Sequence, residues 1–405
     1  MNALTLTILS GLSIPILFGS KRWALLSIVA GALYLTEGMA LTVAGFSLYP
    51  ARFLILVALA RIIVRREFAV VEMNRIDQIL ILLYTYSFGV FLLRSNEGLT
   101  YQLGVVIDSL SLYFTFRTFV RTFDDFKWLI RKMIFLLIPY VPLLWIESIT
   151  SQNLFAVVGG VELARAGDLW FREGRLRAAG SFLHPSLLGT FGGIFLPIYM
   201  AMWLIHGERI IGAIGTCLCI AIVAASNSGG PALCAVAAFI GWMIWPLRFA
   251  MRSVRRALTA MIVLLALVMK APIWYLLARL GSITGGDGYH RAALLDVAFQ
   301  NLDKWWLAGM PLSGTMGWLP YNNVATGHVD ITNYFLLFGL DGGVGSVLSF
   351  VALLVSIFSH LGRSMSMVRS QHQTDNRVEL LLWALGVVVF IHIVNWFGIT
   401  YFDQK

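Results

Sequence analysis

The feature that most constrains this chain is a series of long apolar segments that recurs from one end to the other. Most are about 15 to 25 residues long, roughly the length that crosses about 30 Å of hydrocarbon as a helix. The chain is 59% hydrophobic and 13% charged, with a mean hydropathy of +0.80, which is more apolar surface than a soluble domain can bury. The apolar segments are continuous and do not alternate in the way of membrane β-strands. We therefore expect an all-α, polytopic membrane protein.

The pattern predicts a single integral membrane domain over residues 1–405, with about twelve transmembrane helices. The first segment has neither a positively charged start nor a small-residue cleavage pattern, so we expect it to be retained as a helix. The predicted spans are 3–19, 23–40, 52–64, 77–94, 101–119, 128–147, 186–205, 210–226, 231–247, 257–278, 333–358 and 378–397.

The distribution of Lys and Arg predicts the orientation, because short cytoplasmic loops retain basic residues. Alternating the spans places 19 of the 30 basic residues inside and 10 outside, with Lys270 within a span. The two long connections, 148–185 and 279–332, then lie outside, as do both termini. We interpret the net charge of +9 as a topology signal and a contact with anionic lipid headgroups, and expect no nucleic-acid partner.

The first outer segment, 148–185, contains a cluster of basic side chains, and function is expected in such loops. Four arginines outside the membrane oppose the positive-inside bias, although lipid phosphates alone could account for them. The cluster comprises Arg165, Arg172, Arg175, Arg177 and His184.

The second outer segment, 279–332, opens with glycines and continues as a predicted amphipathic helix, because its apolar residues recur at spacings of three and four. Trp305, Trp306 and Trp318 follow this helix. Tryptophans at a membrane surface anchor the chain in the headgroup region or stack on sugars. The segment then brings His328, Asp330 and Asn333 to the start of the next span, where a single His also has an ordinary structural interpretation.

Several short motifs in these two segments resemble those of a known family. They are Arg177-Ala-Ala-Gly180 followed by His184-Pro185, then Tyr289-His290-Arg291, WWLAG at 305–309, and Asp330-Ile-Thr-Asn333 ahead of Gly342-Gly343. Over residues 120 to 360 the chain resembles the O-antigen ligase and polysaccharide polymerase superfamily, especially exopolysaccharide polymerases. Ligases of this family often have adjacent His and Asn in the second loop. Here Val329 follows His328, which favours a polymerase-like member.

The resemblance implies a membrane glycosyltransferase with a GT-C-like fold in the bacterial inner membrane, with its active site facing the periplasm. It would transfer a saccharide from undecaprenyl pyrophosphate to the hydroxyl of a glycan or lipid-linked acceptor, without a metal or other cofactor. Arginines are suited to binding the pyrophosphate as its charge increases, because a guanidinium stays charged and binds phosphate through two hydrogen bonds.

The resemblance and this chemistry together assign roles to individual residues. His328 is the expected general base, since an imidazole titrates near neutral pH, and Asp330 either orients it or replaces it. The expected substrate-binding residues are Arg175, Arg177, His184, His290, Arg291, Trp305, Trp306 and Asn333.

Two other classes of protein stay open. A transporter, including a flippase of lipid-linked sugars, is suggested by ionisable residues in predicted spans, namely Glu37, Asp108, Lys270 and Asp341. We find no internal repeat of the kind that secondary transporters often show. A noncatalytic membrane scaffold is the other alternative. The three cysteines, Cys217, Cys219 and Cys234, all fall in predicted spans, where we expect them to pack.

Overall fold

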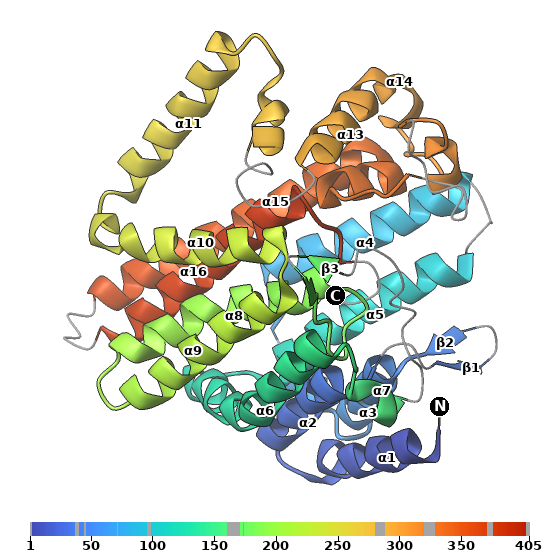
Figure 1. Cartoon of the computed structure of the whole chain (residues 1–405), viewed down its shortest axis with the longest axis vertical. Helices are drawn as coiled ribbons and strands as arrows, with labels where there is room; N and C mark the ends of the chain where they lie inside the picture. The colour runs from blue at the N-terminus through green and yellow to red at the C-terminus, as the bar shows by residue number, and fades with distance from the viewer. Residues whose placement is uncertain are drawn as a thin grey trace.

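The computed structural model describes residues 2–36, 40–43, 46–70, 72–94, 99–159, 171–172, 174–279, 288–319, 329–370 and 376–401. Within these ranges the chain is overwhelmingly helical, which confirms the expected all-α class (Figure 1). Every predicted span overlaps a helix. The long helices are α1 (Ala3–Phe18), α2 (Lys21–Tyr34), α3 (Pro50–Val64), α4 (Arg75–Arg94), α5 (Leu99–Phe119), α6 (Phe123–Thr150), α8 (Pro185–Leu204), α9 (Arg209–Ser226), α10 (Gly229–Met243), α11 (Met251–Val268), α15 (Tyr334–Ser370) and α16 (Arg377–Trp396).

Shorter elements connect these helices. Two antiparallel hairpins lie in connections that are predicted to be outside, β1 (Leu41–Val43) with β2 (Phe46–Leu48) and β3 (Phe171–Arg172) with β4 (Arg175–Leu176). The predicted amphipathic helix of the second outer segment is present as α13 (Gly288–Gln300). The remaining short helices are η1 (Glu67–Val70), α7 (Phe155–Gly159), η3 (Trp245–Leu247), η4 (Ile273–Tyr275), α14 (Leu302–Trp305) and η5 (Leu312–Thr315).

Six of the helices are long and apolar enough to cross a membrane: α4, α6, α8, α9, α15 and α16. A seventh candidate is the pair Met251–Val268 and Ile273–Arg279, which bends by 102° at the break between its two parts. The predicted span over 257–278 is therefore broken rather than continuous, and Lys270 lies exposed in the bend. The number and apolar character of these helices mark the chain as a membrane protein.

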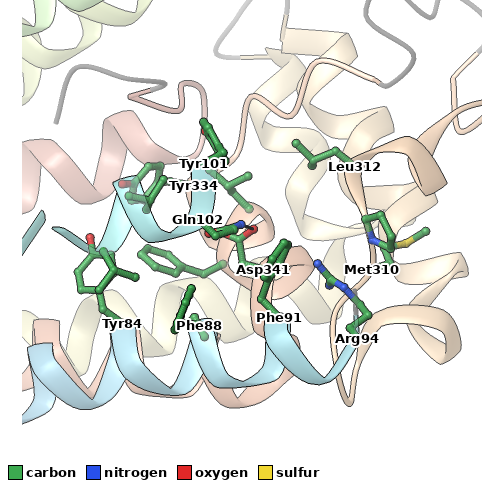
Figure 2. Close-up of a pocket in the computed structure, with 16 residues that line it drawn as sticks. Tyr84, Phe88, Phe91, Arg94, Tyr101, Gln102, Met310, Leu312, Tyr334 and Asp341 are labelled. Carbon is green, nitrogen blue, oxygen red and sulfur yellow. Dashed lines mark hydrogen bonds between the residues drawn. The ribbon is translucent and has the colours of Figure 1, made fainter. Parts of the chain in front are cut away.

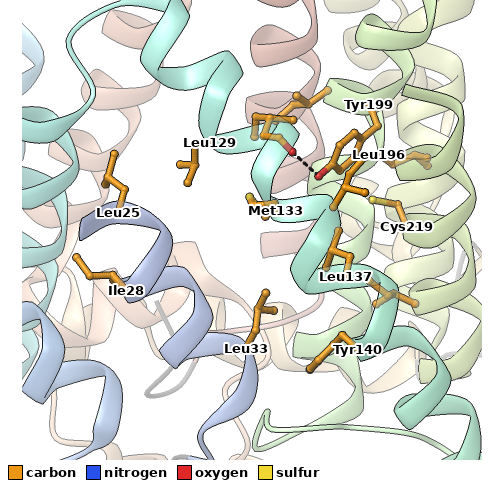
Figure 3. Packing of buried hydrophobic residues seen from close by; sticks show 14 of the residues in the cluster. Leu25, Ile28, Leu33, Leu129, Met133, Leu137, Tyr140, Leu196, Tyr199 and Cys219 are labelled. Carbon is orange, nitrogen blue, oxygen red and sulfur yellow. Dashed lines mark hydrogen bonds between the residues drawn. The ribbon is translucent and has the colours of Figure 1, made fainter. Parts of the chain in front are cut away.

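The core forms where α8 packs against α9, α10 and α16, with α6 and α2 alongside (Figure 3). Glycines allow the α8 and α9 backbones to approach closely, as is common between membrane helices. A Cβ added to Gly215 would lie 2.1 Å from the Tyr199 ring. The Tyr199 hydroxyl donates a 3.0 Å hydrogen bond to the Ile130 carbonyl, so this buried phenol also ties α8 to α6.

Helix α15 is broken at Gly342 and Gly343, whose backbone angles are not helical. The segment 305–309 from the second outer connection packs directly against the break. The Val344 N–H donates to the Trp306 carbonyl at 2.8 Å, and the Met310 N–H donates to the Leu340 carbonyl at 2.8 Å. These bonds satisfy backbone groups that the break would otherwise leave without partners inside the protein.

Ion pairs tie together helix ends that are all predicted to lie inside. Two of the pairs join residues 103 and 77 positions apart, and the other two join residues 6 and 10 positions apart. The pairs are Arg22 with Asp125, Arg61 with Glu67, Arg131 with Glu208 and Arg369 with Glu379. Basic and acidic side chains therefore pair at the helix ends that the sequence pattern predicts to lie inside.

Candidate functional site

The arginines of the first outer segment lie on and just after a tight hairpin. Arg172 of β3 and Arg175 of β4 are directly opposite each other in the register. Gly174 makes the turn with a φ of 73°. Like charges directly opposite in a two-stranded pair are destabilising. Arg175 also lies over the ring of Trp145 at 5.6 Å, so an aromatic residue of α6 helps to hold the hairpin.

Arg177 follows this hairpin and connects two helix N-termini. Its Nη2 donates a 2.6 Å hydrogen bond to the hydroxyl of Ser228, the N-cap of α10. The same nitrogen lies 3.4 Å from the hydroxyl of Ser186, in the first turn of α8. Helix N-termini carry partial positive charge and exposed N–H groups, which favour a bound anion. The guanidinium therefore lies where two such termini meet.

The environment of Arg177 opposes its positive charge. Its side chain is almost entirely buried, with 9% exposed. Burial, together with the nearby charge of Arg172, lowers the pKa of Arg177 to about 10. A bound anion would offset both effects, so the position is electrostatically suited to a phosphate or pyrophosphate group.

Gly180, three residues after Arg177, allows the chain to pack tightly against α6. Its φ is 60°, and an added Cβ would lie 2.6 Å from the Tyr140 hydroxyl and 2.7 Å from Leu144 Cδ2. Its N–H donates to the carboxylate of the buried Glu147 at 2.8 Å, and the Ala179 N–H donates to the same carboxylate at 3.2 Å. Glu147 was not among the residues that the sequence singled out.

His184 is the N-cap of α8. Its Nδ1 accepts the Ser186 N–H at 3.1 Å, so this nitrogen carries no proton. Burial and the charge of Arg177 lower the pKa of His184 to about 4. The ring is therefore neutral at pH 7 and too weakly basic for an efficient general base. Its geometry supports a positioning role for the first turn of α8 instead.

The second outer segment brings its predicted residues to the start of α15 and the end of α16. Arg291 lies so close to Gly398 that an added Cβ would be 2.7 Å from the guanidinium carbon. His290 Nε2 is 3.2 Å from the Asp330 carbonyl oxygen. Asn333 is buried, and its side chain accepts the Leu336 N–H at 3.0 Å, which places it at the start of α15.

Arg177 and Arg291 are connected through the ends of α10 and α16. Arg177 binds the N-cap of α10, and two residues later a Cβ added to Gly230 would lie 3.3 Å from Asn395 Oδ1. The Asn395 carbonyl in turn accepts the N–H of Gly398, the glycine against which Arg291 lies. Arg177 therefore lies at the start of α10 and Arg291 just beyond the end of α16, and these two helix ends contact each other.

The other predicted residues occupy varied positions. His328 lies outside the described residues, and Asp330 is exposed beside His290. Trp306 is 52% exposed and available to a ligand. Trp305 is 6% exposed and its indole N–H donates to the Ala298 carbonyl at 2.9 Å, so the structure gives it a packing position.

Among the residues expected within spans, two have charged or polar partners in the structure. The Asp108 carboxylate is held by two hydrogen bonds from Arg52, at 2.8 and 2.5 Å. Asp341 accepts a 3.2 Å hydrogen bond from the Gln102 amide and lies on a cavity between α4, α5 and α15 (Figure 2). Glu37 lies outside the described residues. The cavity was not predicted, although Asp341 and the adjacent glycines had pointed to this part of the chain.

No family model, curated protein or solved structure matches this chain.

Proposed function

We propose that this chain is a membrane glycosyltransferase that moves a saccharide from undecaprenyl pyrophosphate to an acceptor hydroxyl. The supporting observation is the approach of Arg177 and Arg291 to the ends of α10 and α16, with Arg172 and Arg175 close to Arg177. Arg177 lies where the N-termini of α8 and α10 meet, and Arg291 lies just beyond the end of α16. Arginines that two loops bring to these helix ends form a suitable site for a lipid-linked pyrophosphate.

In the proposed reaction, the bond from the anomeric carbon to the phosphate oxygen breaks and its electron pair stays on the pyrophosphate. A bond forms between the anomeric carbon and the acceptor oxygen, whose proton goes to a general base. The arginines stabilise the negative charge that grows on the leaving group. His328 is our candidate for the base, with Asp330 as orienting group or substitute. His290 lies beside Asp330 and helps to position that segment.

We further propose that twelve helices cross the inner membrane, with 148–185 and 279–332 in the periplasm. The four ion pairs described above support this orientation, because their residues lie at helix ends that the positive-inside rule assigns to the cytoplasm. We favour a polymerase-like reaction over transfer to a lipid core. The ligases that this chain resembles often have adjacent His and Asn, whereas here Val329 follows His328.

The test is donor binding by Arg177→Lys and Arg291→Lys proteins in lipid nanodiscs. Each substitution keeps the charge but removes the planar, two-pronged donor geometry. We expect each to weaken the binding of an undecaprenyl-pyrophosphate saccharide by about tenfold or more, as for loss of a charge-assisted hydrogen bond. Arg256→Lys, in the exposed first turns of α11, is the matched control. Full donor affinity in both loop variants would refute the site.

A transporter remains the second candidate, because α15 is broken at Gly342 and Gly343 beside a cavity. Broken membrane helices commonly form the substrate sites of transporters. A transporter would move its substrate across a bilayer without covalent change, whereas the proposed enzyme makes a new glycosidic bond.

A further inference from the structure

A partly enclosed cavity beside α15 is not used by the arginine site. It has a volume of 220 Å³ and lies between α4, α5 and the first part of α15, under residues 310–312 (Figure 2). Six of its sixteen lining residues are aromatic. The rings come from Tyr84, Phe88, Phe91, Tyr101, Tyr334 and Phe338.

The roof of this cavity is fixed by the broken part of α15. The Met310 N–H donates to the Leu340 carbonyl at 2.8 Å, and Arg94 Nη1 donates to the same carbonyl at 2.8 Å. Gly309 has a φ of 64°, and an added Cβ would lie 2.1 Å from that oxygen. The outer connection therefore closes over the cavity in a single tight arrangement.

A negatively charged and a positively charged side chain both face the cavity. Asp341 accepts a hydrogen bond from Gln102 at 3.2 Å, and Arg94 lies on the same lining, as Figure 2 shows. Among the described residues, the Nε of Arg94 is buried with no hydrogen-bond partner. A buried donor without an acceptor destabilises the folded protein, and a hydrogen bond to a ligand or to water would remove this cost.

This lining excludes several classes of ligand on chemical grounds. Arg94 and Asp341 carry opposite charges on the same lining, so the cavity offers no net charge to a phosphate or to a cation. A hydrocarbon chain would pack well against the rings. It would also displace water from Asp341, Gln102 and Arg94, and it could not replace the hydrogen bonds that the water makes to them. A neutral pyranose meets both requirements, because its C–H faces stack on aromatic rings and its hydroxyls both donate and accept.

The cavity also adjoins the arginine site. Tyr334, on its wall, stacks on Trp396 with ring centroids 5.6 Å apart. Trp396 directly follows Asn395, which lies against Gly230 at the N-terminus of α10. The end of α16 therefore contacts the cavity wall through Trp396 and the start of α10, where Arg177 binds, through Asn395.

We propose that this cavity binds a neutral sugar ring, and that it holds the terminal sugar of the acceptor glycan. The second part of this inference rests on the proposed transferase function. The sugar-binding part depends only on the cavity, so the two can fail separately.

The test is saturation-transfer difference NMR on the full chain in nanodiscs, with methyl pyranosides of glucose, galactose, mannose and N-acetylglucosamine. We expect at least one glycoside to bind saturably. Asp341→Asn and Gln102→Leu, which nearly keep side-chain shape, should each weaken this binding by about tenfold. Ser366→Ala, near the other end of α15, is the control. Thermal unfolding of each variant establishes that it is folded.

Three results would overturn the inference. The first is that none of the glycosides binds, and the second is that both folded variants bind a glycoside as tightly as the unmodified protein does. The third is that farnesyl phosphate displaces the glycoside equally strongly from the unmodified protein and from Asp341→Asn. Saccharide transfer is measured on the same samples. Normal transfer by a variant that no longer binds glycoside contradicts the acceptor assignment alone. Glycoside binding by unmodified protein that makes no product contradicts the transferase function alone.

Discussion

The carboxylate of Glu147 accepts the N–H of Gly180 at 2.8 Å and thereby anchors the segment that carries Arg177. Glu147 is fully buried near the C-terminal end of α6. A buried carboxylate is tolerated when hydrogen bonds replace its lost hydration. The position of Arg177 therefore depends on a residue thirty positions earlier in the chain.

Gly180→Ala should destabilise the protein more than Gly174→Ala. Both glycines have positive φ, which costs an alanine roughly 1 to 2 kcal/mol. Nothing lies within 4 Å of a Cβ at Gly174, whereas one at Gly180 meets Tyr140 and Leu144. We expect an additional cost of about 1 to 3 kcal/mol at Gly180 from overpacking. Thermal unfolding in nanodiscs gives the comparison, and equal shifts in the two variants would contradict this packing.

Acidification should weaken the structure around His184. The pKa of His184 is lowered to about 4 from an ordinary value near 6.5, so the unfolded chain binds the proton more readily. The contribution of neutral His184 to the free energy of unfolding is fully present above about pH 6.5. It is lost progressively as the pH falls toward 4, by at most about 3 kcal/mol. The unfolding temperature of the unmodified protein should fall over this range. His184→Asn, which can still cap a helix, should show a shallower fall.

Replacement of the candidate base should affect turnover more than donor binding. We expect His328→Ala to lower the catalytic rate by about 10² to 10⁴-fold, because a general base acts in the transition state. Asp330→Asn should cost less if the carboxylate only orients the imidazole. If Asp330→Asn were inactive while His328→Ala stayed active, Asp330 would be the general base. Full activity in both variants would remove catalysis from this segment.

The sequence predicted the helices well because apolar runs report directly which segments can lie in hydrocarbon. It predicted their ends less well, since polar residues also continue helices. The last described turns of α15 extend to Ser370, beyond the predicted end at 358, and α11 begins with a basic turn at Met251. The predicted span 23–40 ends early, because α2 stops at Tyr34.

The site was only partly predictable for a different reason. Arg177 and Arg291 could be selected because their side chains suit a pyrophosphate, but their proximity to the same helix ends depends on how α10 packs against α16. Ser228 and Asn395 carried no recognisable motif. Glu147 did leave a signal, a carboxylate at the end of an apolar segment, since such residues are costly in a membrane and usually have a role.

Topology can be tested with reporters that are active on only one side of the membrane. Fusions after residues 160 and 315 should report from the periplasm, and a fusion after residue 253 should report from the cytoplasm. The basic helix ends and their ion pairs are the reason for this expectation. If the fusions at 160 and 315 reported from opposite sides, the twelve-helix arrangement would be wrong.

The most direct test of the central claim is to supply the purified chain, in liposomes, with a defined undecaprenyl-pyrophosphate oligosaccharide that can serve as both donor and acceptor. The proposed function predicts a longer covalent glycan with release of undecaprenyl pyrophosphate, and about tenfold or greater loss of product for Arg177→Lys at limiting donor. Movement of the intact lipid-linked sugar between leaflets, with no new glycosidic bond, would contradict the transferase and identify a carrier.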